Sequence, residues 1–327
     1  MRAGERGYAL LLALVVVATL AFVVLASARV LNDVTVSTVR LQESRNEVVA
    51  AESLLSRAAF LLLTEEVGPS SLIIDDARFD GGSLNLDGKW YLVRGVRGAS
   101  IAVQDEAGLF NLNSSDEQAL AALLALDGQA TSAELAAALM DYTDGDDLTR
   151  DRGAEARAYA RAGLAPPADR ALSSRWQALE ALGWREARVE RSPVWPWLTA
   201  GPVDMALNVN TAPAAVLQAV LGDRRRAEAL VARREASPFR DIAEVEALTG
   251  GTARADGVTF AVAPARGFRV QAVFGSQAAR HGIERRLELG DAEAERPFEW
   301  VEEREVRLAP LRDGEAINSL SLDAPAS

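Results

Sequence analysis

The chain has 327 residues, of which 49% are hydrophobic and 25% are charged, and its formal net charge is −12. This length provides one large or two medium domains with packed cores, while the negative charge argues against broad nucleic-acid binding, which needs a basic surface. Cysteine is absent and His281 is the single histidine, so the composition excludes disulfides and thiolate chemistry and leaves little material for a histidine-based zinc site or a Ser-His-Asp triad.

The N-terminus begins with a short polar segment that contains Arg2 and Arg6. The run from Tyr8 to Ala28 that follows has no charged residue, and at about 1.5 Å per residue it forms a helix roughly 30 Å long, enough to cross a bilayer core. The preceding arginines predict that the short end stays in the cytoplasm and that the remaining chain lies outside the inner membrane. A plain single-pass anchor is one alternative. A signal peptide cut after Ala28 is another, although this apolar core is longer than an ordinary one.

The junction between the polar segment and the apolar run resembles the N-terminus of type IV prepilins and pseudopilins. In that family a membrane peptidase cuts after a glycine, here Gly7, and methylates the new N-terminal residue, here Tyr8. The resemblance implies that residues 1–7 are a leader that prepilin peptidase removes. Most pilins carry a glutamate where this chain has Leu12, and in the family this carboxylate neutralises the N-terminal amine of the subunit above. An unpaired carboxylate is costly in a membrane, so Leu12 indicates a tip subunit; alternatively, it is an ordinary membrane residue.

A helical pattern continues beyond the apolar run. Apolar residues recur at steps of three, four or seven as far as Leu62, and neither proline nor glycine occurs between Tyr8 and Val67. The spacing predicts one long helix that ends near Thr64, with a transmembrane part over residues 8–28 and an amphipathic periplasmic part over residues 29–64.

The remaining chain alternates between β-prone and helical segments. Strands are expected at residues 89–96, 100–105, 267–274, 283–289 and 298–308. Helices are expected between them, at residues 132–142, 175–182, 224–235 and 242–248.

This order predicts an α+β fold. Residues 65–112 and 257–327 form a β domain whose antiparallel sheet packs on the long N-terminal helix. An all-α domain, residues 113–256, is inserted in the β region.

The helical segment contains a weak internal repeat. Asn111-Leu-Asn113 and Asn208-Val-Asn210 each lead from an extended stretch into an Ala/Leu-rich helix. The second copy, with Leu221-Gly-Asp-Arg224 and two further arginines, resembles helix-hairpin-helix modules, whose backbone amides hold a phosphate. The domain around it is acidic, so a packing motif with solvated arginines is the favoured interpretation, and no nucleic-acid partner is expected.

The most informative polar cluster is acidic and consists of Asp141, Asp144, Asp146, Asp147 and Glu155. Carboxylates this close repel one another unless a cation or solvent intervenes, and hard oxygen ligands at short spacing suit Ca²⁺. The cluster is not an EF-hand, because the position that needs glycine holds a threonine. We expect these five side chains to bind a structural Ca²⁺; a solvated acidic loop and a pair of catalytic carboxylates are the alternatives.

In their order and spacing, these features resemble the protein K family of type II secretion systems, the large minor pseudopilins. The resemblance covers nearly the whole chain and rests on Arg6-Gly7, Leu12, Asp105-Glu-Ala-Gly108, Asn111-Leu-Asn113, the run from Asp141 to Tyr159, Asn208-Val-Asn210-Thr-Ala-Pro213 and Pro238-Phe239.

The resemblance implies a pilin-like α+β fold with a large helical insertion, and Ca²⁺ in or beside that insertion. It implies a non-enzymatic subunit, anchored by a single span in the inner membrane of a Gram-negative bacterium, with its C-terminal bulk in the periplasm. Such a subunit joins minor pseudopilins I and J, among other pseudopilins, in a tip complex that starts pseudopilus assembly for protein export across the outer membrane.

Two other functions remain open. The first is a helix-hairpin-helix DNA-binding protein of a competence system, which would use Arg224, Arg225 and Arg226. The second is a membrane-anchored periplasmic hydrolase that would use the carboxylates between Asp141 and Glu155.

Overall fold

The structure is a computed structural model that describes residues 3–74, 82–93, 99–114, 116–250, 254–255, 258–274, 280–290, 295–308 and 318–320. They fall into two compact units, Met1–Glu52 and Ser53–Ser327, and we describe each by itself. Within the described part of the chain, no helix is both long and apolar enough to cross a membrane.

Helix α1 (Ala3–Thr64) makes up the described part of the first unit and continues into the second. It ends at the residue that the sequence predicted. Gly7, Tyr8 and Leu12 lie within α1, but their side chains, like several others of the predicted span, lie outside the described part of the structure. The expectations for cleavage, methylation, the fibre tip and the membrane span therefore stay predictions.

The last turns of α1 supply part of the core of the second unit. Leu54, Leu55, Ala58, Leu61 and Leu62 are each at most 5% exposed. Their spacing places them along one face of the helix, as in an amphipathic helix that packs against a core.

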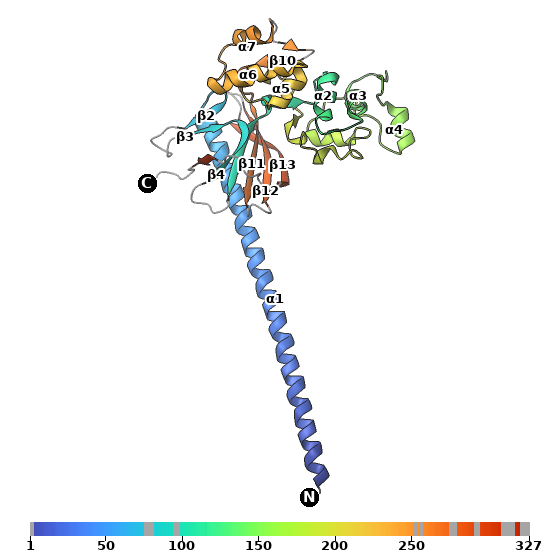
Figure 1. Cartoon of the computed structure of the whole chain (residues 1–327), viewed down its shortest axis with the longest axis vertical. Helices are drawn as coiled ribbons and strands as arrows, with labels where there is room; N and C mark the ends of the chain where they lie inside the picture. Colours follow the sequence, from blue (N-terminus) through green and yellow to red (C-terminus); the bar gives the residue numbers. More distant parts are fainter. Residues whose placement is uncertain are drawn as a thin grey trace. The chain divides into compact units, whose positions relative to one another are not determined.

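The larger sheet has the strand order β13-β12-β11-β5-β4-β14 (Figure 1). Its strands are β4 (Asp87–Val93), β5 (Ser100–Asp105), β11 (Gly267–Phe274), β12 (Arg280–Leu289), β13 (Phe298–Leu308) and β14 (Asn318–Leu320). Neighbouring strands are antiparallel except β4 and β14, which are parallel. The structure thus confirms the mixture of helix and antiparallel sheet, and the two β-prone regions join in one sheet because β5 pairs with β11. A smaller sheet consists of β1 (Glu66–Val67), β2 (Ser71–Ile74) and β3 (Gly82–Asn85).

The strand pairing sorts the side chains of the larger sheet onto two faces, because directly opposed residues share a face. One face is mainly apolar: Ile101, Val103, Phe268, Val270 and Leu287 are all 0% exposed. The other face carries polar and charged side chains: Gln104, Arg269, Gln271, Glu284 and Arg286. A charged sheet face that is also buried requires partners for its charges.

Residues 106–266 leave the sheet between β5 and β11 and form two halves. The first contains η1 (Glu106–Gly108), β6 (Phe110–Asn111), α2 (Glu117–Ala125), α3 (Ser132–Thr143), α4 (Ala156–Ala162), the 3₁₀ turns η2 (Arg175–Glu180), η3 (Val189–Arg191) and η4 (Trp195–Trp197), and β7 (Leu198–Thr199). The second contains β8 (Leu207–Asn208), α5 (Ala214–Leu221), α6 (Arg224–Ala236), α7 (Ile242–Thr249), β9 (Arg254–Ala255) and β10 (Val258–Ala261). One hydrophobic core joins both halves and includes Leu120, Leu139, Trp184, Leu217 and Leu230.

The two halves begin with the same construction, so the internal repeat has a structural counterpart. β6 pairs in parallel with β7, and β8 pairs in parallel with β10. The Asn113 side chain accepts from the Leu172 N–H at 2.8 Å and donates to the Leu172 carbonyl at 2.9 Å. Asn210 makes the same two bonds to Phe239, at 2.8 and 2.9 Å. In each half, an asparagine side-chain amide thus makes the pair of backbone hydrogen bonds that a neighbouring strand would otherwise make. This supports the packing interpretation of the motif.

Candidate functional site

Asp105 lies where the sheet meets the helical insertion, at the end of β5. Its side chain is 0% exposed and accepts four hydrogen bonds: Asn208 Nδ2 and Thr211 Oγ1 at 2.8 Å, Ala107 N at 3.0 Å and Ala265 N at 3.1 Å. Burial raises the pKa of Asp105 to about 6, although the bonds from Asn208, Thr211 and the two backbone amides oppose the rise. One carboxylate therefore joins β5, the start of the second half and the chain that returns to β11.

Gly108 allows this close approach. A Cβ atom at Gly108 would lie 2.5 Å from Thr211 Oγ1 and 2.8 Å from the Thr211 carbonyl oxygen, which is closer than real Cβ atoms come to other heavy atoms. The segment Asp105-Glu-Ala-Gly108 of the sequence analysis is thus a joint between two parts of the fold.

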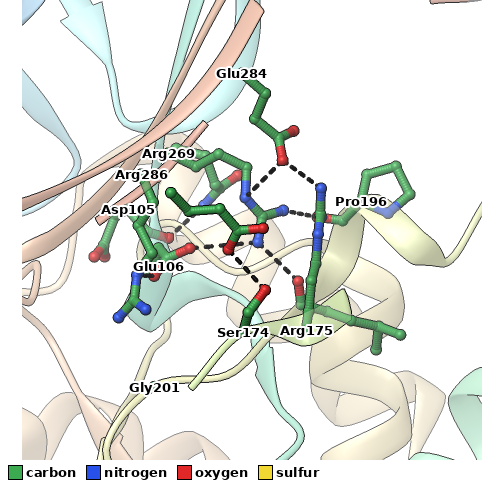
Figure 2. Close-up of polar contacts among 12 residues, drawn as sticks. Asp105, Glu106, Ser174, Arg175, Pro196, Gly201, Arg269, Glu284 and Arg286 are labelled. Carbon is green, nitrogen blue, oxygen red and sulfur yellow. Dashed lines mark hydrogen bonds and ion pairs between the residues drawn. The ribbon is translucent and has the colours of Figure 1, made fainter. Parts of the chain in front are cut away.

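The charged face of the sheet is covered by residues 173–199, which we call the covering segment. Five charged side chains meet at this contact and form what we call the junction network: Glu106, Arg175, Arg269, Glu284 and Arg286 (Figure 2). Arg175 comes from the covering segment, and its Nη2 lies 2.5 Å from Glu284 Oε1 on β12. The Nε atom of Arg286 lies 2.6 Å from Glu106 Oε2. The network therefore crosses from the sheet to the insertion.

Arg269 of the sheet and Arg175 of the covering segment also donate to backbone carbonyls of the covering segment. Arg269 donates to Pro196 O and Leu198 O, both at 2.8 Å (Figure 2). Arg175 donates to Trp195 O at 3.2 Å, and its guanidinium lies 5.2 Å from the centre of the Trp195 ring. Irregular backbone that is buried needs such partners, and here the arginines provide them.

The junction network holds three guanidinium groups and two carboxylates, and most of it is removed from water. Arg175 and Arg269 are 6% and 5% exposed, and Glu106 and Glu284 are 2% and 7% exposed. Burial and, next, repulsion from Arg269 lower the pKa of Arg175 to about 10. Burial by itself would raise the pKa of Glu284, but Arg269 and Arg175 outweigh it and lower this pKa. Glu284 is therefore the carboxylate that both buried arginines approach, Arg175 at 2.5 Å and Arg269 at 3.9 Å.

The predicted acidic cluster lies in the first half of the insertion, from the end of α3 to the start of α4. Asp141 is 0% exposed, whereas Asp146 and Asp147 are exposed in the loop. Arg150 Nη1 lies 2.9 Å from Asp141 Oδ1 and also contacts Asp144 Oδ2. A guanidinium thus lies between two of the carboxylates for which the sequence predicted a metal ion.

Glu155 lies near the same carboxylates but forms no ion pair with an arginine or lysine among the residues that the structure describes. It is 8% exposed, and its Oε1 has no hydrogen-bond partner in the described part of the chain. Burial, followed by the negative charges of Asp141, Asp144 and Asp147, raises the pKa of Glu155. Among the described residues, no three Asp, Glu or His side chains are arranged to hold a metal ion as they stand.

In the arginine-rich hairpin of the second half, a carboxylate of the chain itself occupies the place where a bound anion would lie. The Asp223 carboxylate accepts the backbone N–H groups of Arg225 and Arg226, at 2.8 and 3.2 Å, at the start of α6. A helix-hairpin-helix module would use amides at this place for a phosphate. These two amides are therefore already bound to a carboxylate and are not free to hold a phosphate, which does not favour the DNA-binding alternative.

None of the five residues of the junction network was predicted from the sequence to form a site. One signal was available, because Arg269 interrupts an otherwise apolar stretch of β11, Gly267-Phe-Arg-Val270. A charged residue inside a buried strand predicts a partner, but the pattern does not say that the partner is Glu284 or that Arg175 joins from the insertion.

Comparison with known proteins adds a sequence match and a fold match. Residues 207–263, which run from β8 to just beyond β10, match the profile of the family described as type II secretion system (T2SS), protein K. The fold resembles a chain in the crystal structure of the GspK-GspI-GspJ complex from the type 2 secretion system of enterotoxigenic Escherichia coli, with a TM-score of 0.53 and 16% identity. The resemblance to type II secretion system protein K is confirmed.

The fold match covers 83% of this chain and 99% of the other chain. At 16% identity it shows that the fold is shared. None of the curated proteins compared with this chain matches it. The protein K profile falls on the half of the insertion that contains Asn208, Asn210 and Thr211, so it includes the two side chains that bind Asp105 and the asparagine that binds Phe239.

Proposed function

We propose that this chain is a non-enzymatic minor pseudopilin at the pseudopilus tip of a type II secretion system, where it starts pseudopilus assembly for protein export across the outer membrane. The observation that carries the proposal is the fold match, which spans 83% of this chain and extends to a protein solved in complex with GspI and GspJ. The protein K profile over residues 207–263 supports it independently. Asp141 and Asp144 share one guanidinium, which supports a structural role for the acidic loop over a hydrolase.

The proposed partners are minor pseudopilins I and J, together with other pseudopilins. Phe60 and Leu63, in the part of α1 that belongs to the second unit, are 48% and 37% exposed. Exposed apolar side chains on one side of a helix are a common basis for packing against other helices. We place the contact with the partner helices on this side of α1.

The proposal includes the N-terminal events that the sequence predicts. Prepilin peptidase cuts after Gly7 and Tyr8 becomes the methylated N-terminus. The span from Tyr8 to Ala28 anchors the chain in the inner membrane, with the bulk of the protein in the periplasm. Loss of Arg2 and Arg6 removes the charges that hold the helix at the cytoplasmic face, and Leu12 suits a subunit that has none above it.

Co-expression of the full chain with the pilin-like proteins encoded beside it tests the function. We expect a stable complex in mild detergent, in which intact-mass analysis finds this chain without residues 1–7. Leu63→Glu should weaken the complex at least about tenfold, because it buries a charge at the helix contact. The matched control is Val203→Glu, since Val203 is 66% exposed in the insertion. A persistent monomer would contradict the tip-complex function, and a cut after Ala28 would contradict the leader.

We further propose that the acidic loop holds a structural Ca²⁺. Asp141, Asp144 and Glu155 would be the inner ligands, and Asp146 and Asp147 the exposed ones. The chemistry of these residues fits, since they offer hard oxygen ligands and Glu155 is buried with an oxygen that has no hydrogen-bond partner among the described residues. Bound Ca²⁺ would neutralise these carboxylates and so stabilise a fold that has no disulfide.

Saturating Ca²⁺ should raise the melting temperature of the full chain by about 5 °C relative to EDTA, since a ligand at a hundred times its Kd adds about 2.7 kcal/mol. Asp144→Asn should remove most of this increase by removing an inner ligand. Asp151→Asn is the control, because Asp151 lies in the same loop with a fully exposed side chain. Equal responses of the two variants to Ca²⁺ would rule out the proposed ligand set.

A further inference from the structure

Arg150 is the cation that the structure places among the inner carboxylates of the acidic loop. Its Nη1 lies 2.9 Å from Asp141 Oδ1 and contacts Asp144 Oδ2. Its backbone N–H donates to Asp141 Oδ2 at 3.2 Å. Both the side chain and the main chain of this residue thus bind the carboxylate on which the proposed metal site depends.

Of the three inner carboxylates, the one of Glu155 has no counter-charge within the described part of the chain. Glu155 is 8% exposed, yet its Oε1 has no hydrogen-bond partner among the described residues. Arg150 therefore compensates Asp141 and Asp144 but does not satisfy Glu155. A small divalent cation carries twice the charge of one guanidinium and accepts six to eight oxygen ligands, so it is suited to use all three carboxylates.

The Arg150 side chain has an alternative position, near Glu117, that it can occupy if a divalent cation binds to the acidic loop. Its Nε already lies 3.7 Å from Glu117 Oε2 on α2, where Glu117 is 38% exposed. Arg150 and Asp144 line a cavity of about 450 Å³ whose wall also includes Asp204. The side chain is 37% exposed, so it can leave the carboxylates without becoming a buried unpaired charge.

We infer that Arg150 is an internal counter-ion that occupies the acidic loop in the absence of metal, and that a divalent cation such as Ca²⁺ must displace it from Asp141 and Asp144. This inference rests on the proposed Ca²⁺ site and adds that Arg150 regulates the affinity of that site for Ca²⁺. The loop is compensated by one of two cations, and exchange between them moves Arg150 toward Glu117 and the cavity. Calcium affinity is then set by competition within the chain as well as by the ligands.

Calcium titration of the metal-free full chain, followed by calorimetry in mild detergent, tests the inference. Arg150→Gln removes the competing cation and should bind Ca²⁺ about tenfold more tightly than the parent, since a hydrogen bond to a charged group is worth at least that factor. The matched control is Arg152→Gln, which changes the net charge equally in the same loop, where Arg152 is 58% exposed. Its affinity should stay within about twofold of the parent, as expected for a solvent-screened charge.

Thermal unfolding gives a second readout. In EDTA, Arg150→Gln should melt below both the parent and Arg152→Gln, and this difference should vanish in saturating Ca²⁺. If Arg150→Gln does not fold without metal, Arg150→Lys serves instead, because lysine keeps the charge but not the forked donors of the guanidinium. Arg150→Lys should bind Ca²⁺ more tightly than the parent, but by less than the tenfold expected for Arg150→Gln.

The outcomes separate the two proposals. Calcium binding by the parent with no gain in Arg150→Gln or Arg150→Lys would overturn the competition and leave the metal site standing. A gain of the same size in Arg152→Gln would also overturn it, since the effect would then be one of net charge. Absence of Ca²⁺ binding by the parent and by every Arg150 variant would overturn the metal site and the competition together.

Discussion

Replacing Glu284 with glutamine should lower the free energy of unfolding by about 3 kcal/mol, because breaking one partner of a buried ion pair leaves an uncompensated charge. Glu284 is the carboxylate nearest Arg175 Nη2, at 2.5 Å, and it also accepts from Gln271 Nε2 at 2.6 Å. Glutamine keeps the shape of the side chain and one acceptor oxygen, so the loss of free energy of unfolding reports the contribution of the negative charge. Arg269 and Arg286 would keep their ion pairs with Glu106, whereas Arg175 would lose its ion pair with Glu284.

Chemical denaturation of the full chain in mild detergent measures the loss, and Glu303→Gln is its control. Glu303 lies on β13, pairs with Arg285 at 2.6 Å and is 57% exposed, so its neutralisation should change stability by less than about 1 kcal/mol. Hydrogen exchange should localise the effect of Glu284→Gln to the covering segment and the β11–β12 pair. Equal losses in the two variants would show that the junction network is no stronger than a surface ion pair.

The pH dependence of this contribution follows from the lowered pKa of Glu284. A carboxylate whose pKa is lower in the folded state stabilises the fold above its unfolded pKa, and the stabilisation is lost as the pH falls through the folded pKa. The difference between the parent and Glu284→Gln should therefore be constant near neutral pH and shrink only in acid, below the ordinary glutamate range.

Local elements of this fold follow closely from local patterns in the sequence. The predicted helix at residues 132–142 is observed as Ser132–Thr143, and the predicted strand at residues 267–274 is observed as Gly267–Phe274. Each is fixed by periodicity and by residues at its own ends. The joining of the two β-prone regions into one sheet was also predictable, because a β segment on each side of a helical insertion needs a partner.

Interactions between distant residues were not predictable in this way. The helix expected at residues 175–182 is a 3₁₀ turn, Arg175–Glu180, and Arg175 at its start is bonded to Glu284, 109 positions away. No strand was predicted at residues 318–320, yet Asn318–Leu320 pairs with β4. Of the predicted metal ligands, Asp141 and Asp144 share a cation that the carboxylate pattern does not reveal. The acidic spacing indicated that a cation was needed, and only the structure identifies Arg150 as one.

The largest loss of stability is expected at Asp105, where Asp105→Ala should lower the free energy of unfolding by about 4 kcal/mol. The substitution leaves Asn208 Nδ2, Thr211 Oγ1 and two backbone N–H groups without their acceptor, and each buried group left unsatisfied costs about 1–3 kcal/mol. Asp105→Asn keeps one acceptor oxygen and should lose less. Denaturation of both variants tests this order, and an alanine variant as stable as the parent would show that Asp105 does not hold the joint together.

The same carboxylate gives the joint a pH dependence whose sign opposes that of Glu284. Burial raises the pKa of Asp105 from its ordinary 3.8 to about 6 in the folded protein, so the folded state binds this proton more tightly. Its contribution to stability is fully present below pH 3.8 and is lost as the pH rises through 6. Relative to Asp105→Asn, the parent should gain about 1 kcal/mol between pH 7.5 and pH 5, because one pKa unit corresponds to about that free energy. A parent that instead loses stability relative to Asp105→Asn over this range would show that the four donors, and not burial, set the pKa of Asp105.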